Sequence, residues 1–198
     1  MRKDLSQILV SATALFMLPL ASADQACEDF LKTTLSEDLE HIKSDEAHTS
    51  GQLDRIEHLI SDHIDIHAIA KFTFGKYYDD LTQSEFRLYE EALLEHFAEV
   101  ISQNLEASHT VSAEVLDSID RSKSDCIVES AIYRDGLEEI LVLWRVIRRG
   151  DEHHIVDIAL KENGNQIWLS LELRAQVMVV YERTRGDVAA VIQELGLS

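Results

Sequence analysis

The predicted fold rests on two strand-like runs, Glu138-Glu-Ile-Leu-Val-Leu-Trp-Arg-Val-Ile-Arg-Arg149 and Glu152-His-His-Ile-Val-Asp-Ile-Ala-Leu-Lys161, joined by a tight turn at Gly150-Asp151. The first run is apolar on both of its alternating faces, with Val142 and Trp144 on one of them. A strand of this kind has apolar structure against both faces. The second run alternates more cleanly, with Val156 and Ile158 on one face. These runs predict a central hairpin.

Two further strands are predicted before this hairpin, at His109–Ile119 and Asp125–Arg134. Asp135-Gly136 lies between the second and third strands, and Asn163-Gly164 follows the fourth. Such dipeptides favour tight turns between antiparallel neighbours. The sequence therefore predicts an antiparallel meander of about four strands.

Helical spacing of apolar residues flanks the strands on both sides. The predicted helices are Gln25–Lys43, a short one near residues 53–60, Asp65–Phe74, a long one ending near Leu105, Trp168–Arg183 and Asp187–Leu195. Thr82-Gln-Ser-Glu85 matches a capping box at the start of the long helix. Helices, then strands, then helices indicate an α+β fold, in which one antiparallel sheet packs against N- and C-terminal helices.

The composition limits the classes of function. A chain of 198 residues suits one domain with a substantial core. Its formal net charge of −19 argues against a general nucleic-acid binder and against electrostatic docking on anionic lipid headgroups. Hydrophobic residues make up 45% of the chain, which argues against disorder.

The N-terminus has the pattern of a secretory signal. Arg2-Lys3 precede a short apolar run, Ile8–Leu20, and Ala21-Ser22-Ala23 fits a cleavage site. We expect a signal peptide over residues 1–23 and a single domain over residues 24–198. The alternative is an uncleaved anchor. Cleavage would shift the formal charge from −19 to −20, which favours a basic docking surface on any partner.

Cys27 and Cys126 are the two cysteines of the chain. In an oxidising exported compartment they could form one disulfide, and the alternative is two unpaired thiols. Two cysteines are too few for a cysteine-rich zinc site.

Familiar catalytic motifs are absent from the sequence. It contains no Gly-x-Ser-x-Gly, no phosphate-binding loop and no His-Glu-x-x-His. One group of candidate metal ligands occurs within ten residues: His58, Asp62, His63, Asp65 and His67. His63 and His67 have the i,i+4 spacing that lets two imidazoles share a metal. The alternative is a set of solvated helix residues, which the sequence favours because no third ligand is specified.

Two further features each have two interpretations. Arg174 lies in the apolar helix after Trp168, where it could contact a phosphate headgroup or pair with a carboxylate. Five aromatic residues either fill a core or line a cavity for an apolar ligand: Phe72, Phe74, Phe97, Trp144 and Trp168. Periodicity does not separate these alternatives.

Two segments resemble a known family. The first is Asp65-Ile-His-Ala-Ile-Ala-Lys-Phe-Thr-Phe-Gly75 with Lys76-Tyr-Tyr78 and the capping box, and the second is Glu138–Val177 with Val156-Asp157-Ile158 and Leu173-Arg-Ala-Gln-Val177. Together they resemble the MlaC / toluene-tolerance family of periplasmic phospholipid-binding proteins, auxiliary components of an ABC transporter. The chain looks like a divergent member, because Leu173 and Val177 stand where the family has Tyr and Phe.

The resemblance implies a non-enzymatic periplasmic carrier. Such a carrier holds phospholipid as cargo, without a cofactor, in an apolar pocket between sheet and helices. It moves the lipid between outer and inner membranes, working with an outer-membrane lipoprotein complex and an inner-membrane ABC transporter, and it touches membranes only transiently. The residues expected to contact lipid are Phe72, Phe74, Tyr78, Phe97, Val142, Trp144, Val156, Ile158, Trp168, Arg174 and Val177. The alternatives are a periplasmic adaptor with a filled core and, less favoured, a metal-dependent exported enzyme.

Overall fold

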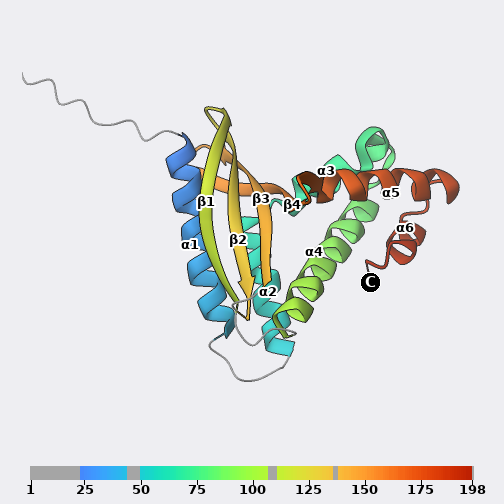
Figure 1. The fold of residues 1–198 in the computed structure, drawn as a ribbon. Helices are drawn as coiled ribbons and strands as arrows, with labels where there is room; N and C mark the ends of the chain where they lie inside the picture. Colours follow the sequence, from blue (N-terminus) through green and yellow to red (C-terminus); the bar gives the residue numbers. More distant parts are fainter. Residues whose placement is uncertain (1–22, 44–49, 107–110, 136–137, 198) are drawn as a thin grey trace, which may run out of the picture.

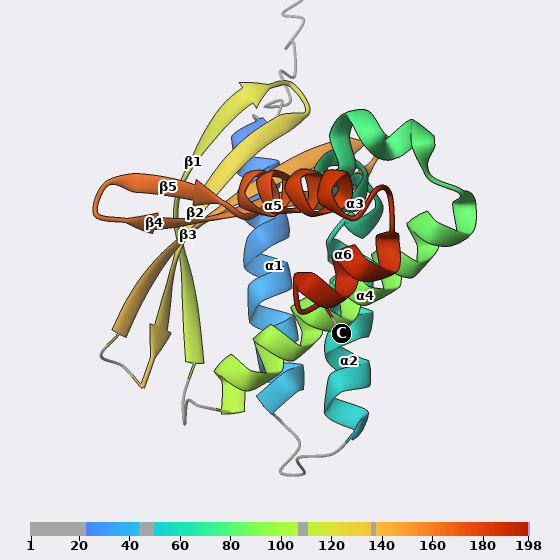
Figure 2. The ribbon, with the colours of Figure 1, turned by 90° about the vertical axis from the view of Figure 1, so that its right-hand side faces the viewer.

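A five-stranded antiparallel sheet lies at the centre of the computed structural model, which describes residues 23–43, 50–106, 111–135 and 138–197. Each strand pairs with its neighbour in sequence, in the order β1-β2-β3-β4-β5 (Figures 1 and 2). The strands are β1 (Val111–Ser122), β2 (Asp125–Arg134), β3 (Glu138–Arg149), β4 (Glu152–Glu162) and β5 (Asn165–Trp168). The predicted α+β class and meander are confirmed, and β2 and β3 have the predicted bounds.

The fifth strand is the part of the sheet that the sequence did not predict. The chain turns through Asn163 and Gly164, both at positive φ, and then pairs Trp168 with Ala159. Positive φ at two central positions is the geometry of a turn that joins adjacent antiparallel strands. Trp168 therefore ends β5 instead of starting a helix, and α5 (Leu169–Arg183) begins one residue later.

The remaining helices are α1 (Ala23–Lys43), α2 (Ser50–His63), α3 (Ile66–Phe74), the 3-10 helix η1 (Gly75–Asp80), α4 (Gln83–Glu106) and α6 (Val188–Glu194). The predicted capping box starts α4. The backbone N–H of Thr82 donates to the Glu85 carboxylate at 2.8 Å, and the N–H of Glu85 donates to the Thr82 hydroxyl at 3.3 Å. The Thr82 hydroxyl also donates to the Glu85 carboxylate, and this hydrogen bond, followed by the one from the Thr82 N–H, lowers the pKa of Glu85.

Buried residues gather mainly in two places. One group joins α3, α4, α5 and α6, and its fully buried members include Phe74, Tyr89, Leu93, Val177 and Val191. The other lies between α1 and the sheet and contains Cys27, Leu31, Cys126, Val128, Val146 and Ile155. A smaller group joins α2 to α4. The helices α3 to α6 thus form a packed unit beside the sheet, as Figure 2 shows.

α1 is fastened to the sheet by a disulfide between Cys27 and Cys126, which are 99 residues apart in sequence. This is one of the two states that the sequence left open. Ser118 of β1 also donates to Glu28 of α1 at 2.7 Å. The pKa of Glu28 is lowered, first by this hydrogen bond and then by the one from Lys32. Covalent and polar contacts therefore supplement a small apolar interface.

The outer edge of β4 explains how the helical unit is attached. β5 pairs with β4 only from Ala159 onward. Beyond that point Ile64 forms a parallel bridge with Ile155, and the N–H of Asp65 donates to the Ile155 carbonyl at 2.8 Å. Asp65 also caps α3 by accepting from the N–H of Ala68 at 2.8 Å. The chain between α2 and α3 and the start of α5 therefore lie where the sheet edge would otherwise be open.

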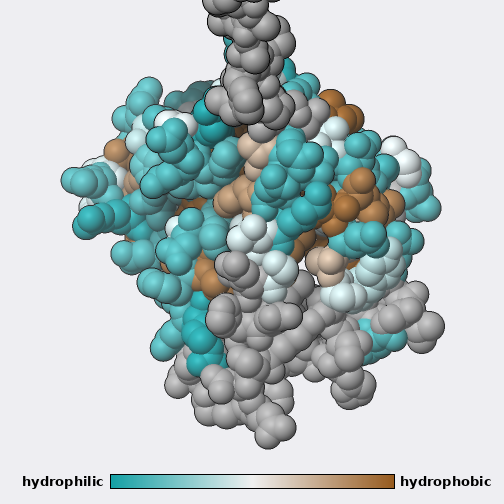
Figure 3. Space-filling view, turned by 90° about the vertical axis from the view of Figure 1, so that its left-hand side faces the viewer, coloured by the Kyte–Doolittle hydropathy of each residue, from teal (hydrophilic) through white to brown (hydrophobic). Residues whose placement is uncertain are grey.

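The face of the molecule on the side of α1 and β1 is largely hydrophilic, with separate hydrophobic patches (Figure 3). None of the helices within the described residues combines the length and the apolar character that crossing a bilayer requires. The signal peptide and cleavage site expected over residues 1–23 lie almost wholly outside the described residues, and both stay predictions.

Candidate functional site

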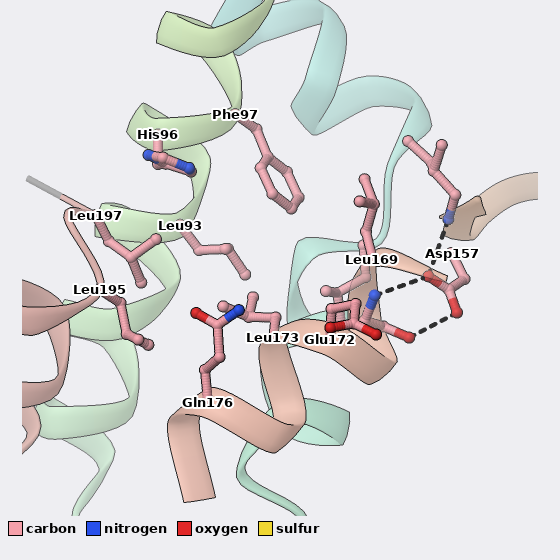
Figure 4. A pocket seen from close by; sticks show the side chains of 13 residues that line it. Leu93, His96, Phe97, Asp157, Leu169, Glu172, Leu173, Gln176, Leu195 and Leu197 are labelled. Atoms are coloured by element: carbon pink, nitrogen blue, oxygen red, sulfur yellow. Dashed lines mark hydrogen bonds between the residues drawn. The ribbon is translucent and has the colours of Figure 1, made fainter. Parts of the chain in front are cut away.

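A cavity of about 230 Å³ lies where β4 meets the helical unit (Figure 4). β4 contributes Asp157 and Ile158, and helix α3 contributes Ile69. The other lining residues come from α4, from α5 and from the end of the chain after α6: Leu93, His96, Phe97, Leu169, Ser170, Glu172, Leu173, Gln176, Leu195 and Leu197. Most of these side chains are apolar, so the cavity suits an apolar ligand.

Exposure separates the floor of the cavity from its rim. Ile69, Leu93 and Leu197 are buried and form the floor. Glu172 and Gln176 are exposed and form the rim on α5. Gln176 reaches from α5 into the space between Leu93 and the other leucines in Figure 4. The cavity therefore has a mainly apolar lining, with one buried polar pair, Asp157 and Ser170, and with polar side chains of α5 at its opening.

Asp157 fixes the start of α5 at the edge of this cavity. Its carboxylate accepts hydrogen bonds from the Ser170 hydroxyl at 2.6 Å and from the Ser170 N–H at 3.2 Å. It also accepts from the N–H of Ile158 at 2.9 Å. Trp168, the residue in the cap position of α5, provides no side-chain cap of its own. Asp157 therefore caps α5 from a neighbouring strand, with its negative charge at the positive end of the helix.

Arg174 fixes the middle of α5 to the end of α3. Its Nη1 donates to the carbonyl oxygen of Phe72 at 2.7 Å, and its guanidinium lies 4.8 Å from the centre of the Phe72 ring. That carbonyl belongs to the last turn of α3. Carbonyl groups in the last turn of an α-helix lack the usual N–H partner four residues further along the helix. Gly75 follows at φ 54°, and a Cβ there would lie 2.5 Å from the guanidinium. The partner of Arg174 in the structure is thus a main-chain carbonyl, and the headgroup contact suggested by the sequence stays a prediction.

The expected lipid-contacting residues fall into several places. Phe97 and Ile158 line the cavity, whereas Phe74 and Val177 are fully buried in the helical core, where the aromatic rings of Tyr89 and Tyr181 pack edge-on against Phe74. Phe74 and Val177 do not line this cavity, because neighbouring helices fill the space around them. The lipid contacts themselves stay predictions.

The other expected residues lie outside the cavity. Val142 is buried on β3, and Trp144, beside the disulfide core, donates its indole N–H to the Ser130 hydroxyl at 2.8 Å. Val156 and Trp168 are partly buried on β4 and β5, and Phe72 is 41% exposed beneath Arg174. Tyr78 packs edge-on against Phe86 at 5.0 Å. None of these residues lines the cavity at β4.

Tyr78 instead borders a second, more polar cavity of about 510 Å³ between η1 and the start of α4. His67 lies there and its Nδ1 is 2.7 Å from a carboxylate oxygen of Glu90. His63 packs against the Phe30 ring of α1. Within the described residues, no three His, Cys, Asp or Glu side chains come together in a way that could hold a metal ion. His63 and His67, the pair with metal-ligand spacing, thus contact different parts of the molecule.

Sequence reasoning missed most of the cavity. Leu93 and Phe97 were identifiable as the apolar stripe of one long helix, and His96 shares that face by its spacing. Leu195 and Leu197 carry no comparable signal, because they follow a short final helix. Asp157 and Ser170 form their contact only because β5 runs back along β4 and brings the start of α5 beside Asp157.

Comparison with known proteins gives the family of the chain. The sequence profile of the family described as MlaC protein matches residues 31–196, which include every residue that lines the cavity except Leu197. The chain belongs to the MlaC family. No curated protein matches it.

A solved structure shares the fold of this MlaC-family chain. It is the phospholipid-binding protein from Ralstonia solanacearum, determined in complex with a phospholipid. The two structures align with a TM-score of 0.72 at 19% sequence identity, covering 89% of this chain and 96% of the other. The meander, the flanking helices and their order are therefore those of the MlaC fold.

Proposed function

We propose that this protein is a periplasmic phospholipid carrier, exported by a cleavable signal peptide. It moves lipid between the outer and inner membranes as a non-enzymatic component of an ABC-transporter system. The observation that carries the proposal is the apolar cavity between β4 and α3–α6 in a chain of the MlaC family. The phospholipid held by the structurally similar Ralstonia protein supports the same cargo.

The energetics of lipid transfer suit a carrier with an internal apolar site. Burying one CH₂ group contributes about 0.8 kcal/mol, so two acyl chains of roughly 15 methylenes each represent on the order of 24 kcal/mol. A lipid therefore crosses water at a useful rate only inside a carrier. Since the sequence has no phosphate-binding loop, direction must come from the partners that load and unload the protein.

The size of the cavity implies that loading enlarges it. Pockets for drug-sized ligands have volumes of about 300–1,000 Å³, and the cavity here measures about 230 Å³. Its rim is formed by α5, whose fixed points are Asp157 at the start and Arg174 in the middle. We therefore place the movement that admits acyl chains in α5 and α6, which pack on each other and on α4.

A second candidate is a periplasmic adaptor whose core is filled. Phe74 and Val177, expected to contact lipid, are fully buried among other side chains, and this favours the adaptor. The two candidates differ in whether purified protein contains lipid.

The test uses residues 24–198 produced in a bacterial periplasm. Native mass spectrometry followed by solvent extraction should find about one diacyl phospholipid per chain. Protein that is folded but empty, and that stays empty when offered vesicles, would favour the adaptor and overturn the carrier.

A pair of variants on one helix locates the binding site. Leu173→Glu places a charge in the cavity and should abolish copurified lipid, because a carboxylate is costly to bury beside acyl chains. Val179→Glu places the same charge on α5 at a side chain that is 62% exposed, and it should leave the lipid unchanged. Equal lipid content in two folded variants would show that acyl chains bind elsewhere.

A further inference from the structure

The carboxylates among the lining residues give the cavity a negative charge. Asp157 and Glu172 are acidic, and the remaining polar members of the lining are His96, Ser170 and Gln176. Among the residues described as lining the cavity there is no arginine and no lysine. The Arg174 side chain, which shares a helix with Glu172, is directed to the carbonyl of Phe72 on α3.

The start of α5 offers no free site for a phosphate. A helix N-terminus attracts anions through its unpaired N–H groups and its dipole. At α5 this position already holds a carboxylate, because Asp157 accepts from both the N–H and the hydroxyl of Ser170. Asp157 is 9% exposed and Ser170 is 4% exposed, so the pair is buried and a lipid phosphate would meet its negative charge.

We infer that the cavity selects phospholipids whose headgroup ends in a cationic amine over phospholipids with a net negative charge. The inference rests on the carrier function proposed above. With acyl chains in the apolar floor, the headgroup lies at the rim, beside Glu172 and Gln176. An ammonium group there gains an ion pair with Glu172 and a hydrogen bond with the Gln176 amide. An anionic headgroup there meets the Glu172 carboxylate, and no lysine or arginine of the lining compensates for it.

The charge of the whole chain acts in the same direction. A formal net charge of −19 produces a negative potential around the protein, which disfavours anionic lipids before they reach the cavity. Salt screens both this long-range effect and the ion pair at the exposed Glu172. The two contributions are therefore separated by substitutions at and away from the rim.

The experiment is a competition between two lipids with identical acyl chains. Residues 24–198, stripped of lipid, are incubated at pH 8 with vesicles of equimolar phosphatidylethanolamine and phosphatidylglycerol, and the bound lipids are extracted and quantified. We expect phosphatidylethanolamine to be enriched about three- to fivefold, the range that one solvent-exposed ion pair supports. Enrichment should fall as salt is added, because the ion pair with the exposed Glu172 is screened together with the long-range potential.

Variants at the rim assign the selectivity to Glu172. Glu172→Gln should lower the enrichment to about half, and Glu172→Lys should bring the two lipids to near equality or reverse the order. Glu95→Gln is the matched control, because it removes one carboxylate from an exposed position on α4 that does not line the cavity. Glu172 is itself exposed, so these variants should fold.

The outcomes separate the inference from the function on which it rests. Protein that takes up neither lipid overturns the carrier proposal. Protein that takes up both lipids equally, or prefers phosphatidylglycerol, leaves the carrier intact and overturns the headgroup selectivity. A loss of enrichment that is as large in Glu95→Gln as in Glu172→Gln would assign the effect to net charge and overturn the role of the rim.

Discussion

Gly75 has no side chain, and this allows Arg174 of α5 to reach the end of α3. It follows α3 at φ 54°, and its α-carbon faces the guanidinium of Arg174. Any larger residue would adopt an unfavourable backbone conformation, and its Cβ would displace the Arg174 guanidinium from the Phe72 carbonyl. The Arg174 contact is therefore available only because glycine stands at this position.

Replacing Gly75 with alanine should destabilise the protein more than the same change at another positive-φ glycine. Gly150, at φ 65°, has no atom within 4 Å of a built Cβ, so Gly150→Ala reports the backbone cost alone. We expect Gly75→Ala to lose at least about 1 kcal/mol more in the free energy of unfolding, measured with urea. The excess should shrink in the Arg174→Ala background, and an unchanged excess would contradict the clash.

Because the phenol of Tyr89 is buried, we expect the folded protein to lose stability at alkaline pH. Burial raises the pKa of its phenol to about 12, from 10.0 in an exposed tyrosine. Between these values the folded state binds more protons than the unfolded state, so stability is fully present below pH 10 and is lost as pH rises toward 12. The loss is on the order of 3 kcal/mol.

The measurement compares unfolding free energies of the wild type and Tyr89→Phe from pH 8 to pH 12. The variant also loses the Thr73–Tyr89 contact of 3.1 Å, which produces a constant offset below pH 10. The two curves should then converge as the pH rises. Parallel curves over the whole range would mean that the phenol titrates normally.

At the scale of elements, the sequence predicted features that depend on residues within one element. It missed features that depend on residues far apart in the chain. The apolar patterns of β3 and β4 and the capping box of α4 each depend on residues within one element. The two strands and the start of α4 were predicted correctly. β5 has only four residues, too few for a periodic signal. The Arg174–Phe72 hydrogen bond joins residues 102 positions apart, so only the folded chain defines it. Most of the cavity depends on contacts of this second kind.

The link between β4 and α5 should behave as a coupled pair. Asp157→Ala leaves the buried Ser170 hydroxyl and N–H without their acceptor, which should cost about 1–3 kcal/mol in unfolding free energy. Ser170→Ala should cost less, because the N–H can still donate to Asp157. The double variant should be more stable than the sum of the single losses predicts. Additive losses in urea unfolding would show that the two side chains act independently.

At the scale of the whole molecule, the sheet and the helical unit have different roles. β2 and β3 are paired on both sides and the disulfide joins β2 to α1, whereas α5 and α6 border a cavity smaller than the proposed cargo. A rigid sheet beside a movable pair of helices is consistent with a carrier that must both hold and release lipid.

Hydrogen exchange should locate the movement. On loading phosphatidylethanolamine, we expect amides of α5 and α6 to change their exchange rates, because the cavity must widen around the acyl chains. Amides in β2 and β3 should exchange as before, which provides an internal control. A change confined to β2 and β3, or none in α5 and α6, would place the opening elsewhere.

The disulfide between α1 and β2 has a consequence for biosynthesis. The ribosome makes α1 before the sheet that it covers, and the partner of Cys27 follows 99 residues later. Until β2 is complete the first thiol has no correct partner in its own chain. Because the sequence contains two cysteines, no incorrect pairing within one chain exists, and the remaining error is a bond between two nascent molecules. The yield of native protein should therefore depend on how crowded the chains are during oxidation more than on isomerase activity.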